Sequence, residues 1–204
     1  MLVELNELNK SYHNGVFEVA ALKNINLKIN KGEFTVFAGP SGSGKTTLLN
    51  IVGTMDKLSS GEVRVDGIEL SALSKNEASD FRKDKIGFIF QSYNLIPVLT
   101  VYENVEFILD LVGKFTKLEK ELKINTLLEE LGLLEYKNRK PSELSGGQQQ
   151  RVAIARALIK EPLIVLADEP TANLDSKTGE NILDLMKKLN EDKENDLLKD
   201  VNLK

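Results

Sequence analysis

The sequence predicts an α/β fold with a parallel-sheet core, an N-terminal antiparallel β subdomain and a helical subdomain inserted between about residues 95 and 160. Short apolar runs typical of strands buried on both faces recur at 34–38, 86–90 and 163–167. Segments with apolar residues three or four apart lie between them, which is the period of helices. With 204 residues and no internal repeat or low-complexity linker, the chain is expected to form a single domain spanning 1–204.

The elements are expected in the following chain order. Residues 1–35 form strands, among them 19–29, where apolar residues alternate at 25, 27 and 29. A turn precedes the strand 34–38, and a helix covers 45–52. A strand pair around 63–65 and 68 turns at Asp66-Gly67. The strand 86–90, helical segments from 101 to about 134 and from 145 to 160, the strand 163–167 and a helix over 176–189 complete the order. After Asn190 the chain reads as an atypical polar tail, 191–204, without a strand.

Composition and charge exclude several classes of protein. The chain has no cysteine, which excludes a disulfide framework and thiol chemistry and fits a reducing compartment. The net charge of −4 does not support a nucleic-acid-binding surface, which is normally basic. The acidic N-terminal segment is not a signal peptide, and no apolar run reaches the ~20 residues needed to cross a bilayer. We therefore expect no direct membrane insertion and no nucleic-acid partner.

A glycine-rich segment after the strand 34–38 matches the phosphate-binding pattern G-x-x-x-x-G-K-[ST]. It reads Gly39-Pro40-Ser41-Gly42-Ser43-Gly44-Lys45-Thr46. Backbone N–H groups of such a loop wrap around phosphate oxygens, and the helix that follows directs its positive end at the same anion. Lys45 adds a full charge at the β- and γ-phosphates, and Thr46 offers a hydroxyl to Mg²⁺. The alternative is a plain Gly/Ser loop before a helix, which the following Lys-Thr disfavours.

Two carboxylates, Asp168 and Glu169, follow the most apolar predicted strand. Open α/β sheets hold ligands at this carboxyl edge of their strands. Asp168 is expected to orient the Mg²⁺ shell, and Glu169 to polarise the attacking water. Two solvated acids at a strand end are the alternative, which the neighbouring phosphate loop makes the minor one.

The segment Leu144-Ser145-Gly146-Gly147-Gln148 offers a second set of backbone N–H groups and a hydroxyl ahead of a helix. A simple helix cap is the alternative interpretation. At this segment the sequence resembles the ABC ATPases, whose signature loop reads LSGGQ. The resemblance implies that the loop closes over ATP held by a partner's phosphate loop. A nucleotide-sandwiched homodimer or an ABC heterodimer is therefore expected.

Three further matches extend the resemblance. Gln91 corresponds to the family's Q-loop glutamine, a Mg²⁺ and water contact that senses the transmembrane partner; a polar strand end is its alternative. Residues 172–175 resemble the D-loop that crosses the dimer interface, or else form a helix-capping turn. Tyr12 stands where the family places an aromatic ring against adenine, although packing on the sheet is nearly as good an explanation.

The resemblance covers Tyr12 to about Asn190, and the segments 90–104 and 169–179 look most like the lipoprotein-releasing and macrolide-exporter branch. It implies a transporter subunit that binds and hydrolyses Mg-ATP to drive export or release of a substrate by an integral membrane permease. Such a subunit is cytoplasmic and peripheral at the inner face of the membrane. The apolar strip 95–99 is core or, if exposed, would suit docking of a permease helix.

The expected site residues follow from these matches, with ATP and Mg²⁺ as cofactors. Glu169, Gln91 and Lys45 are expected to be catalytic, and Thr46, Gln91 and Asp168 to hold the metal. The expected nucleotide contacts are Tyr12, Gly39, Pro40, Ser41, Gly42, Ser43, Gly44, Lys45, Thr46, Thr47, Gln91, Ser145, Gly146, Gly147 and Gln148.

One family feature is absent from the sequence. Relatives carry an apolar strand ending in a Thr-His pair after the D-loop helix, whereas the single histidine here is His13. We therefore expect the sheet to lack an edge or internal strand, and the family's closing strands and C-terminal helix to be missing. Hydrolysis is expected to be slower than in a complete relative. The alternative function is an ATP-binding but hydrolysis-impaired dimerisation switch. A truncated product without a physiological role is a third possibility. A cassette acting on DNA or ribosomes is disfavoured, because such proteins usually carry two cassettes or a long coiled-coil insertion.

Overall fold

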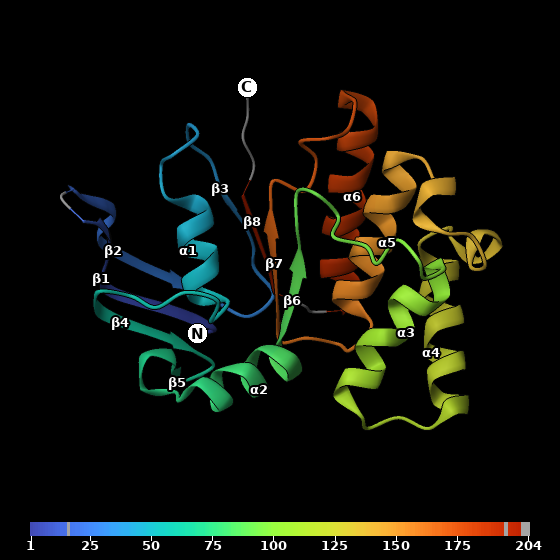
Figure 1. Ribbon diagram of the computed structural model, residues 1–204, viewed down its shortest axis with the longest axis horizontal. Helices are drawn as coiled ribbons and strands as arrows, with labels where there is room; N and C mark the ends of the chain where they lie inside the picture. Colours follow the sequence, from blue (N-terminus) through green and yellow to red (C-terminus); the bar gives the residue numbers. More distant parts are fainter. Residues whose placement is uncertain (16, 194–195, 201–204) are drawn as a thin grey trace.

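The computed structural model describes residues 1–15, 17–193 and 196–200 and contains two four-stranded sheets with six α-helices in those ranges. Figure 1 shows the antiparallel sheet on one side of the parallel strands and most helices on the other. Helix α1 (Lys45–Val52) has the bounds predicted from the sequence. It shares a core with both sheets and lies between them.

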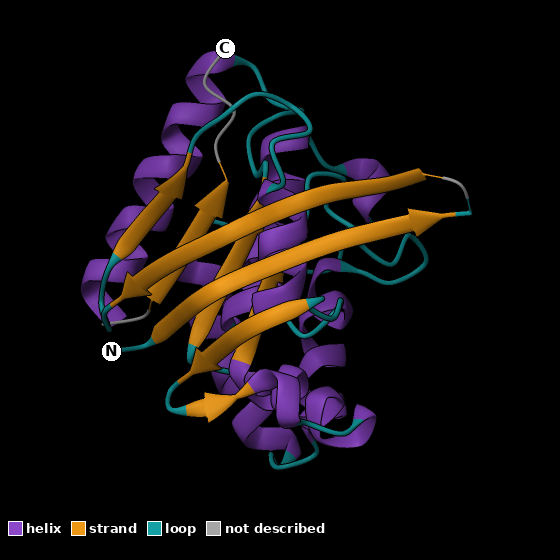
Figure 2. Ribbon diagram, turned by 90° about the vertical axis from the view of Figure 1, so that its left-hand side faces the viewer, coloured by secondary structure: helices purple, strands orange, loops and turns teal. Residues whose placement is uncertain are grey.

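The first sheet is antiparallel, with the order β2-β1-β4-β5. Its strands are β1 (Val3–Asn14), β2 (Phe17–Ile29), β4 (Ser60–Val65) and β5 (Ile68–Glu69). The predicted turn at Asp66 and Gly67 joins β4 to β5, and both residues have positive φ, 50° and 77°. Positive φ at both positions is the geometry of a tight two-residue hairpin turn. Figure 2 shows the long strands of this sheet lying across the parallel strands.

The second sheet is parallel, with the order β3-β8-β7-β6. It consists of β3 (Phe34–Phe37), β6 (Ile86–Ile89), β7 (Ile164–Asp168) and β8 (Asp196–Asp200). Strand β7 is buried on both faces, as predicted from its apolar run. Ile164 and Leu166 face the core shared with α1, while Val165 and Ala167 face the helical side. The sheet therefore separates two hydrophobic cores.

The prediction that residues 191–204 contain no strand is wrong for Asp196–Asp200. This segment forms β8, which pairs in parallel with β3 on one side and β7 on the other. The expectation that the core sheet lacks an internal strand is wrong for the same reason. Backbone pairing decides the outcome here: β3 and β7 both need partners for their N–H and C=O groups. In the observed order β3-β8-β7-β6, strand β8 supplies that partner to both.

Strand β3 also differs from expectation, because it lies at the edge of the described parallel sheet rather than inside it. Val36 is 43% exposed, and the other residues of the strand are half-buried. The apolar run 34–38 therefore does not mark a strand buried on both faces. A short apolar run has the same appearance in sequence at a sheet edge and at its centre.

The remaining helices are α2 (Lys75–Lys85), α3 (Val101–Val112), α4 (Lys117–Glu130), α5 (Gly146–Leu158) and α6 (Ser176–Lys193), with short 3₁₀ turns at Leu70–Ala72, Leu134–Tyr136 and Pro141–Glu143. Four of them begin with reciprocal capping boxes, at Ser74, Thr100, Thr116 and Ser145. Each box satisfies two backbone donors that a helix start would otherwise leave unpaired.

Helix α2 was not predicted, although Ser74 and Glu77 give the S-x-x-E pattern of a capping box. The helical segments between 101 and 158 lie between β6 and β7 in the chain and share one core with α6. Among the described residues, no helix is both long and apolar enough to span a membrane.

Candidate functional site

The glycine-rich loop joins β3 to α1 at the carboxyl edge of the parallel sheet. Gly42 and Gly44 have φ of 80° and 93°, a region that favours glycine. A Cβ on Gly44 would lie 2.5 Å from the carbonyl oxygen of Ala21, so β2 packs directly on the loop. The Lys45 ammonium folds back and donates to the carbonyls of Gly39 and Pro40 at 2.9 and 3.1 Å. The loop therefore holds its lysine over the cradle that the motif predicts.

Thr46 and Asp168 meet at this loop although 122 residues separate them. The Thr46 hydroxyl donates to the Asp168 carboxylate at 3.1 Å. A hydroxyl oxygen and a carboxylate oxygen are ligands that a hard cation such as Mg²⁺ accepts. No group of three or more His, Cys, Asp or Glu side chains within the described chain could hold a metal. The hydroxyl–carboxylate pair itself suits Mg²⁺, which keeps waters and takes phosphate oxygens in nucleotide sites.

Glu169 follows directly and has φ of 44°. A residue other than glycine in this region carries backbone strain, and such strain concentrates at functional sites. The conformation places Glu169 at the turn that leaves β7, and its carbonyl accepts a hydrogen bond from the backbone of Ala172. The two carboxylates thus occupy the strand end that the sequence predicted.

Gln91 lies just past the end of β6, the strand that pairs with β7. It is therefore at the same edge of the sheet as Asp168. Its backbone carbonyl accepts a hydrogen bond from the side chain of Asn173 at 2.8 Å, so the predicted Q-loop and D-loop touch. The carboxylate of Asp175 accepts from the backbone N–H of Thr178 at 3.0 Å at the start of α6. Hydrogen bonds with the Thr178 side chain and with this backbone N–H lower the Asp175 pKa. The capping turn considered for residues 172–175 is therefore present.

The turn after Gln91 is held by a side chain that the sequence did not indicate. Tyr93 and Asn94 have positive φ, 58° and 49°. The guanidinium of Arg156, on α5, donates to the carbonyls of both residues, at 2.7 Å to Tyr93. Arg156 thus ties the turn to the helix that follows LSGGQ. No local pattern reveals this contact, because it spans more than 60 residues.

In the signature segment, Ser145 and Gln148 form the capping box of α5. The Ser145 hydroxyl accepts from the Gln148 backbone at 3.3 Å, and the Gln148 side chain accepts from the Ser145 backbone at 2.8 Å. The two glycines are tightly packed: a Cβ on Gly146 would lie 3.2 Å from the Tyr93 hydroxyl, and one on Gly147 would lie 2.8 Å from Thr178. The structure therefore places the loop against both the Q-loop turn and the start of α6.

The two predicted anion-binding loops lie on opposite faces of the parallel sheet. Helix α1 contributes buried residues to the core shared with the antiparallel sheet, whereas α5 contributes to the helical core. Figure 1 shows the two helices on either side of the strands. A single chain thus brings Lys45, Thr46, Asp168 and Gln91 to one sheet edge but keeps LSGGQ on the other face.

Tyr12, on β1, is 41% exposed and makes specific contacts of its own. Its hydroxyl donates to the Asp56 carboxylate at 2.7 Å, and the Lys10 ammonium lies 4.6 Å from its ring centroid. Its strand neighbour is Val19 of β2, two residues from the Ala21 carbonyl that packs on the glycine-rich loop. The backbone of Tyr12 therefore lies beside the part of β2 that packs on that loop, while its hydroxyl reaches the segment after α1.

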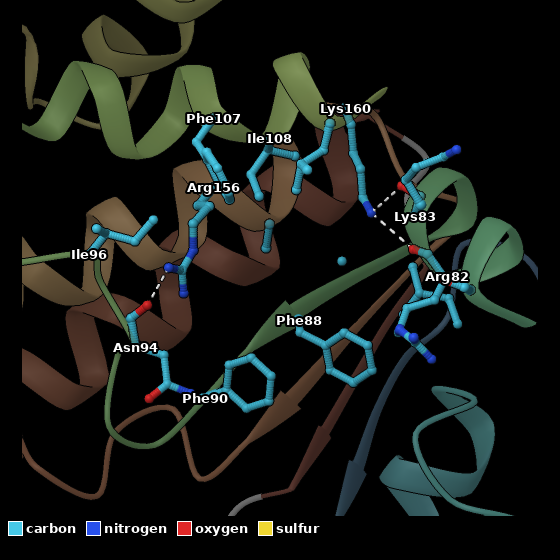
Figure 3. Close-up of a pocket in the computed structure, with 15 residues that line it drawn as sticks. Arg82, Lys83, Phe88, Phe90, Asn94, Ile96, Phe107, Ile108, Arg156 and Lys160 are labelled. Carbon is cyan, nitrogen blue, oxygen red and sulfur yellow. Dashed lines mark hydrogen bonds between the residues drawn. The ribbon is translucent and has the colours of Figure 1, made fainter. Parts of the chain in front are cut away.

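A groove of about 540 Å³ lies between α2, β6, α3 and α5. Phe88, Phe90, Phe107 and Ile108 give it an apolar wall, and Phe88 stacks on Phe90 with centroids 5.5 Å apart. Four cations also line it: Arg82, Lys83, Arg156 and Lys160. Figure 3 shows Arg156 bonded to Asn94 at one end and Lys160 bonded to the carbonyls of Arg82 and Lys83 at the other.

The apolar strip 95–99 is divided between core and surface. Leu95 packs against the helical core, Ile96 lines the groove, and Val98 is 71% exposed. The strip therefore has both core and exposed residues, and docking of a permease helix on its exposed part stays a prediction.

A sequence profile described as "ABC transporter" matches residues 22–172. This chain belongs to the ABC transporter family. It is an ATP-binding cassette of the family's ATPase class, as the resemblance predicted.

The cassette is 52% identical over 196 residues to an uncharacterized ABC transporter ATP-binding protein of Methanocaldococcus jannaschii, MJ0796, covering 94% of this chain and 83% of that protein. A solved structure described as a dimeric post-hydrolysis state of MJ0796 bound to ADP and Pi superimposes with a TM-score of 0.88 at 48% identity. That match covers 98% of this cassette and 88% of the solved chain.

The macrolide export ATP-binding/permease protein MacB of Mannheimia succiniciproducens is 48% identical over 188 residues. The match covers 92% of this cassette but 29% of MacB. It confirms the predicted resemblance to the macrolide-exporter branch.

Proposed function

We propose that this cassette hydrolyses Mg-ATP as a nucleotide-sandwiched pair and drives export or release of a substrate by a membrane permease. The observation that carries the proposal is the Thr46–Asp168 hydrogen bond beside the glycine-rich loop, with LSGGQ on the opposite face of the sheet. One chain supplies a phosphate cradle and a cation site, and a second chain supplies the other half of the enclosure. The export direction rests on the similarity to MacB.

At the nucleotide, the residues of 39–47 bind phosphate and Lys45 places its charge there. Thr46, Asp168 and Gln91 would hold Mg²⁺, which when bound neutralises phosphate charge. Glu169 accepts hydrogen bonds from the attacking water and orients it. Tyr12 forms the platform for adenine.

The second chain places Ser145, Gly146, Gly147 and Gln148 against the γ-phosphate. Backbone N–H groups at the start of α5 can donate to an anion there without disturbing the cap, because a helix start has more donors than its cap uses. The solved dimers of the MJ0796 cassette support pairing of this kind. A second copy of this chain or a related cassette can fill this role, since each partner needs only the same two loops.

The permease docks in the groove between α2 and α3, and the cassette thereby sits at the inner face of the membrane. Aromatic walls flanked by four cations fit an amphipathic helical segment. Arg156 connects this groove to the turn after Gln91, so an occupant can influence the nucleotide site.

Replacing Phe107 by Asp should lower the fraction of the chain that sediments with its native membranes. The matched change Leu118→Asp, on the exposed face of α4, should not.

ATP turnover with Mg²⁺ tests the catalytic part. Glu169→Gln should lower turnover by at least about 100-fold, the effect of removing a general base, while ATP affinity stays near that of the wild type. Glu180→Gln, an exposed carboxylate on α6, is the matched control. Equal turnover of the wild type and Glu169→Gln would rule out the role assigned to Glu169.

The second candidate is an ATP-dependent dimerisation switch with impaired hydrolysis. In this candidate ATP pairs two chains, and the pair acts as a signal without efficient turnover. ATP-induced pairing of the wild-type chain without measurable turnover would select this candidate over the first.

A further inference from the structure

Tyr12, Asp56 and Lys10 form a network of three side chains. Asp56, in the loop after α1, accepts a hydrogen bond from the Tyr12 hydroxyl at 2.7 Å through one carboxylate oxygen. Its other oxygen accepts from the Lys10 ammonium at 2.8 Å and from the backbone N–H of Lys57 at 2.7 Å. Both oxygens of Asp56 are therefore used, and each bond comes from a different direction.

Lys10 anchors the network from a buried position beside the Tyr12 ring. The residue is only 9% exposed, and its ammonium also donates to the Lys57 carbonyl at 2.6 Å. Burial alone would raise the pKa of Asp56, but the bonds from Lys10, Tyr12 and the Lys57 backbone outweigh it and lower that pKa. The carboxylate thus stays charged at neutral pH, and charge-assisted bonds hold it in one orientation.

These contacts fix the Tyr12 ring at two points. Its hydroxyl is tied to Asp56, and the Lys10 cation lies 4.6 Å from its centroid, within cation–π range. The ring is nevertheless 41% exposed. A tyrosine of a strand surface that only packed on the sheet would need neither an ion pair beneath it nor a carboxylate in a loop 44 residues away.

We propose that Asp56 is a positioning residue for the nucleobase, which orients the Tyr12 ring as a preformed stacking platform, with Lys10 as its anchor. The inference rests on the proposed role of Tyr12 toward adenine. Holding the ring before the nucleotide arrives removes the entropy cost of ordering it on binding. Asp56 therefore contributes to affinity for the base while the glycine-rich loop contributes affinity for the phosphates.

The test compares binding of ATP with binding of inorganic tripolyphosphate, which lacks the base. Asp56→Ala and Tyr12→Phe should each weaken ATP binding on the order of five- to tenfold, the usual net effect of losing one hydrogen bond. Tripolyphosphate affinity should not change in either variant. The double variant should bind ATP no more weakly than the weaker single variant, because both changes break the same bond.

Two controls separate this inference from the function on which it rests. Asp80→Ala removes an exposed carboxylate paired with Lys83 on α2 and should leave both affinities unchanged. Lys45→Ala should weaken both ligands, and Tyr12→Ala should weaken ATP alone. If Tyr12→Ala weakens ATP while Asp56→Ala and Tyr12→Phe bind it normally, the positioning role is wrong and the platform stands.

Two other results would overturn the proposal. Unchanged ATP binding in Tyr12→Ala would remove the platform and the positioning role together. Equal loss of ATP and tripolyphosphate affinity in Asp56→Ala, with normal ATP binding in Tyr12→Phe, would show that Asp56 maintains the fold of the loop after α1 instead. Tyr12→Phe keeps the ring and the sheet, so it decides the question even if Asp56→Ala folds poorly.

Discussion

At the scale of single residues, Lys160 shows how the fold changes the chemistry of a side chain. It follows α5, and its ammonium donates to the carbonyls of Arg82 and Lys83, which end α2. Burial lowers the pKa of Lys160 to about 8, and the nearby Arg82 acts in the same direction. The charge of Asp84 opposes both. A lysine that loses its proton near pH 8 is a nucleophile in a groove that we assign to the permease.

Acylation of Lys160 by an amine-reactive acylating reagent should therefore reach its half-maximal rate near pH 8, against about 10.4 for an unperturbed lysine. Between these values the unfolded chain keeps this proton and the folded chain does not, so the free energy of unfolding should rise with pH across that window. Asp84→Asn should move the half-point lower, because it removes the charge that favours the ammonium. Mass spectrometry of labelled peptides measures both shifts. A Lys160 half-point at the unperturbed value would contradict the burial argument.

At the scale of elements, the same kind of capping box begins an exposed helix, α2, and a buried helix, α5. Ser74 begins α2, whose only buried residue is Phe81, and Ser145 begins α5, which is buried along most of its length. Both hydroxyls accept the N3 backbone N–H at 3.3 Å. The structural contribution of the two serines should therefore be similar, although only Ser145 belongs to the signature loop.

Ser74→Ala and Ser145→Ala should each lower the free energy of unfolding by about 1 kcal/mol, the usual cost of losing an N-cap. Urea denaturation measures this. In a Glu169→Gln background, ATP-dependent pairing should be weakened by Ser145→Ala and unaffected by Ser74→Ala. If the two variants pair equally well, the hydroxyl of Ser145 acts only as a cap.

At the scale of the whole molecule, the parallel sheet depends on its last described strand. Strand β8 is hydrogen-bonded to both β3 and β7, with Leu198 opposite Thr35 and Leu166. Without it, β3 would lose its parallel partner and β7 would present an unpaired edge. The glycine-rich loop leaves β3, and the two carboxylates leave β7, so β8 also sets the spacing of the two halves of the nucleotide site.

Leu198→Pro should lower the free energy of unfolding by at least about 2 kcal/mol, because the strand loses a donor and a ladder carbonyl is left unpaired. ATP affinity should fall with it as β3 and β7 separate. Leu198→Val keeps the backbone N–H and is the matched control. Normal stability of the proline variant, measured by urea denaturation, would mean that β8 does not join the two strands in solution.

Local patterns predicted much of this fold because their causes are local. The helix 45–52 follows from the glycines before it and from its apolar face, and its bounds agree with α1. Helix α2 was missed because it has almost no apolar face: Phe81 is its only buried residue. Strand β8 was missed because its residues are largely polar, and a strand with neighbours on both sides is specified by backbone pairing as much as by its own side chains.

The sequence by itself determined the family, the phosphate loop, the pair Asp168 and Glu169, and the signature segment, since each is a short motif whose chemistry depends on adjacent residues. Only the tertiary structure decided that Thr46 meets Asp168, that Arg156 holds the turn after Gln91, and that Asp56 ties down Tyr12. These contacts join residues 44 to 122 positions apart. Hydrogen bonds act over about 3 Å, so chain folding alone determines which distant side chains come within that range.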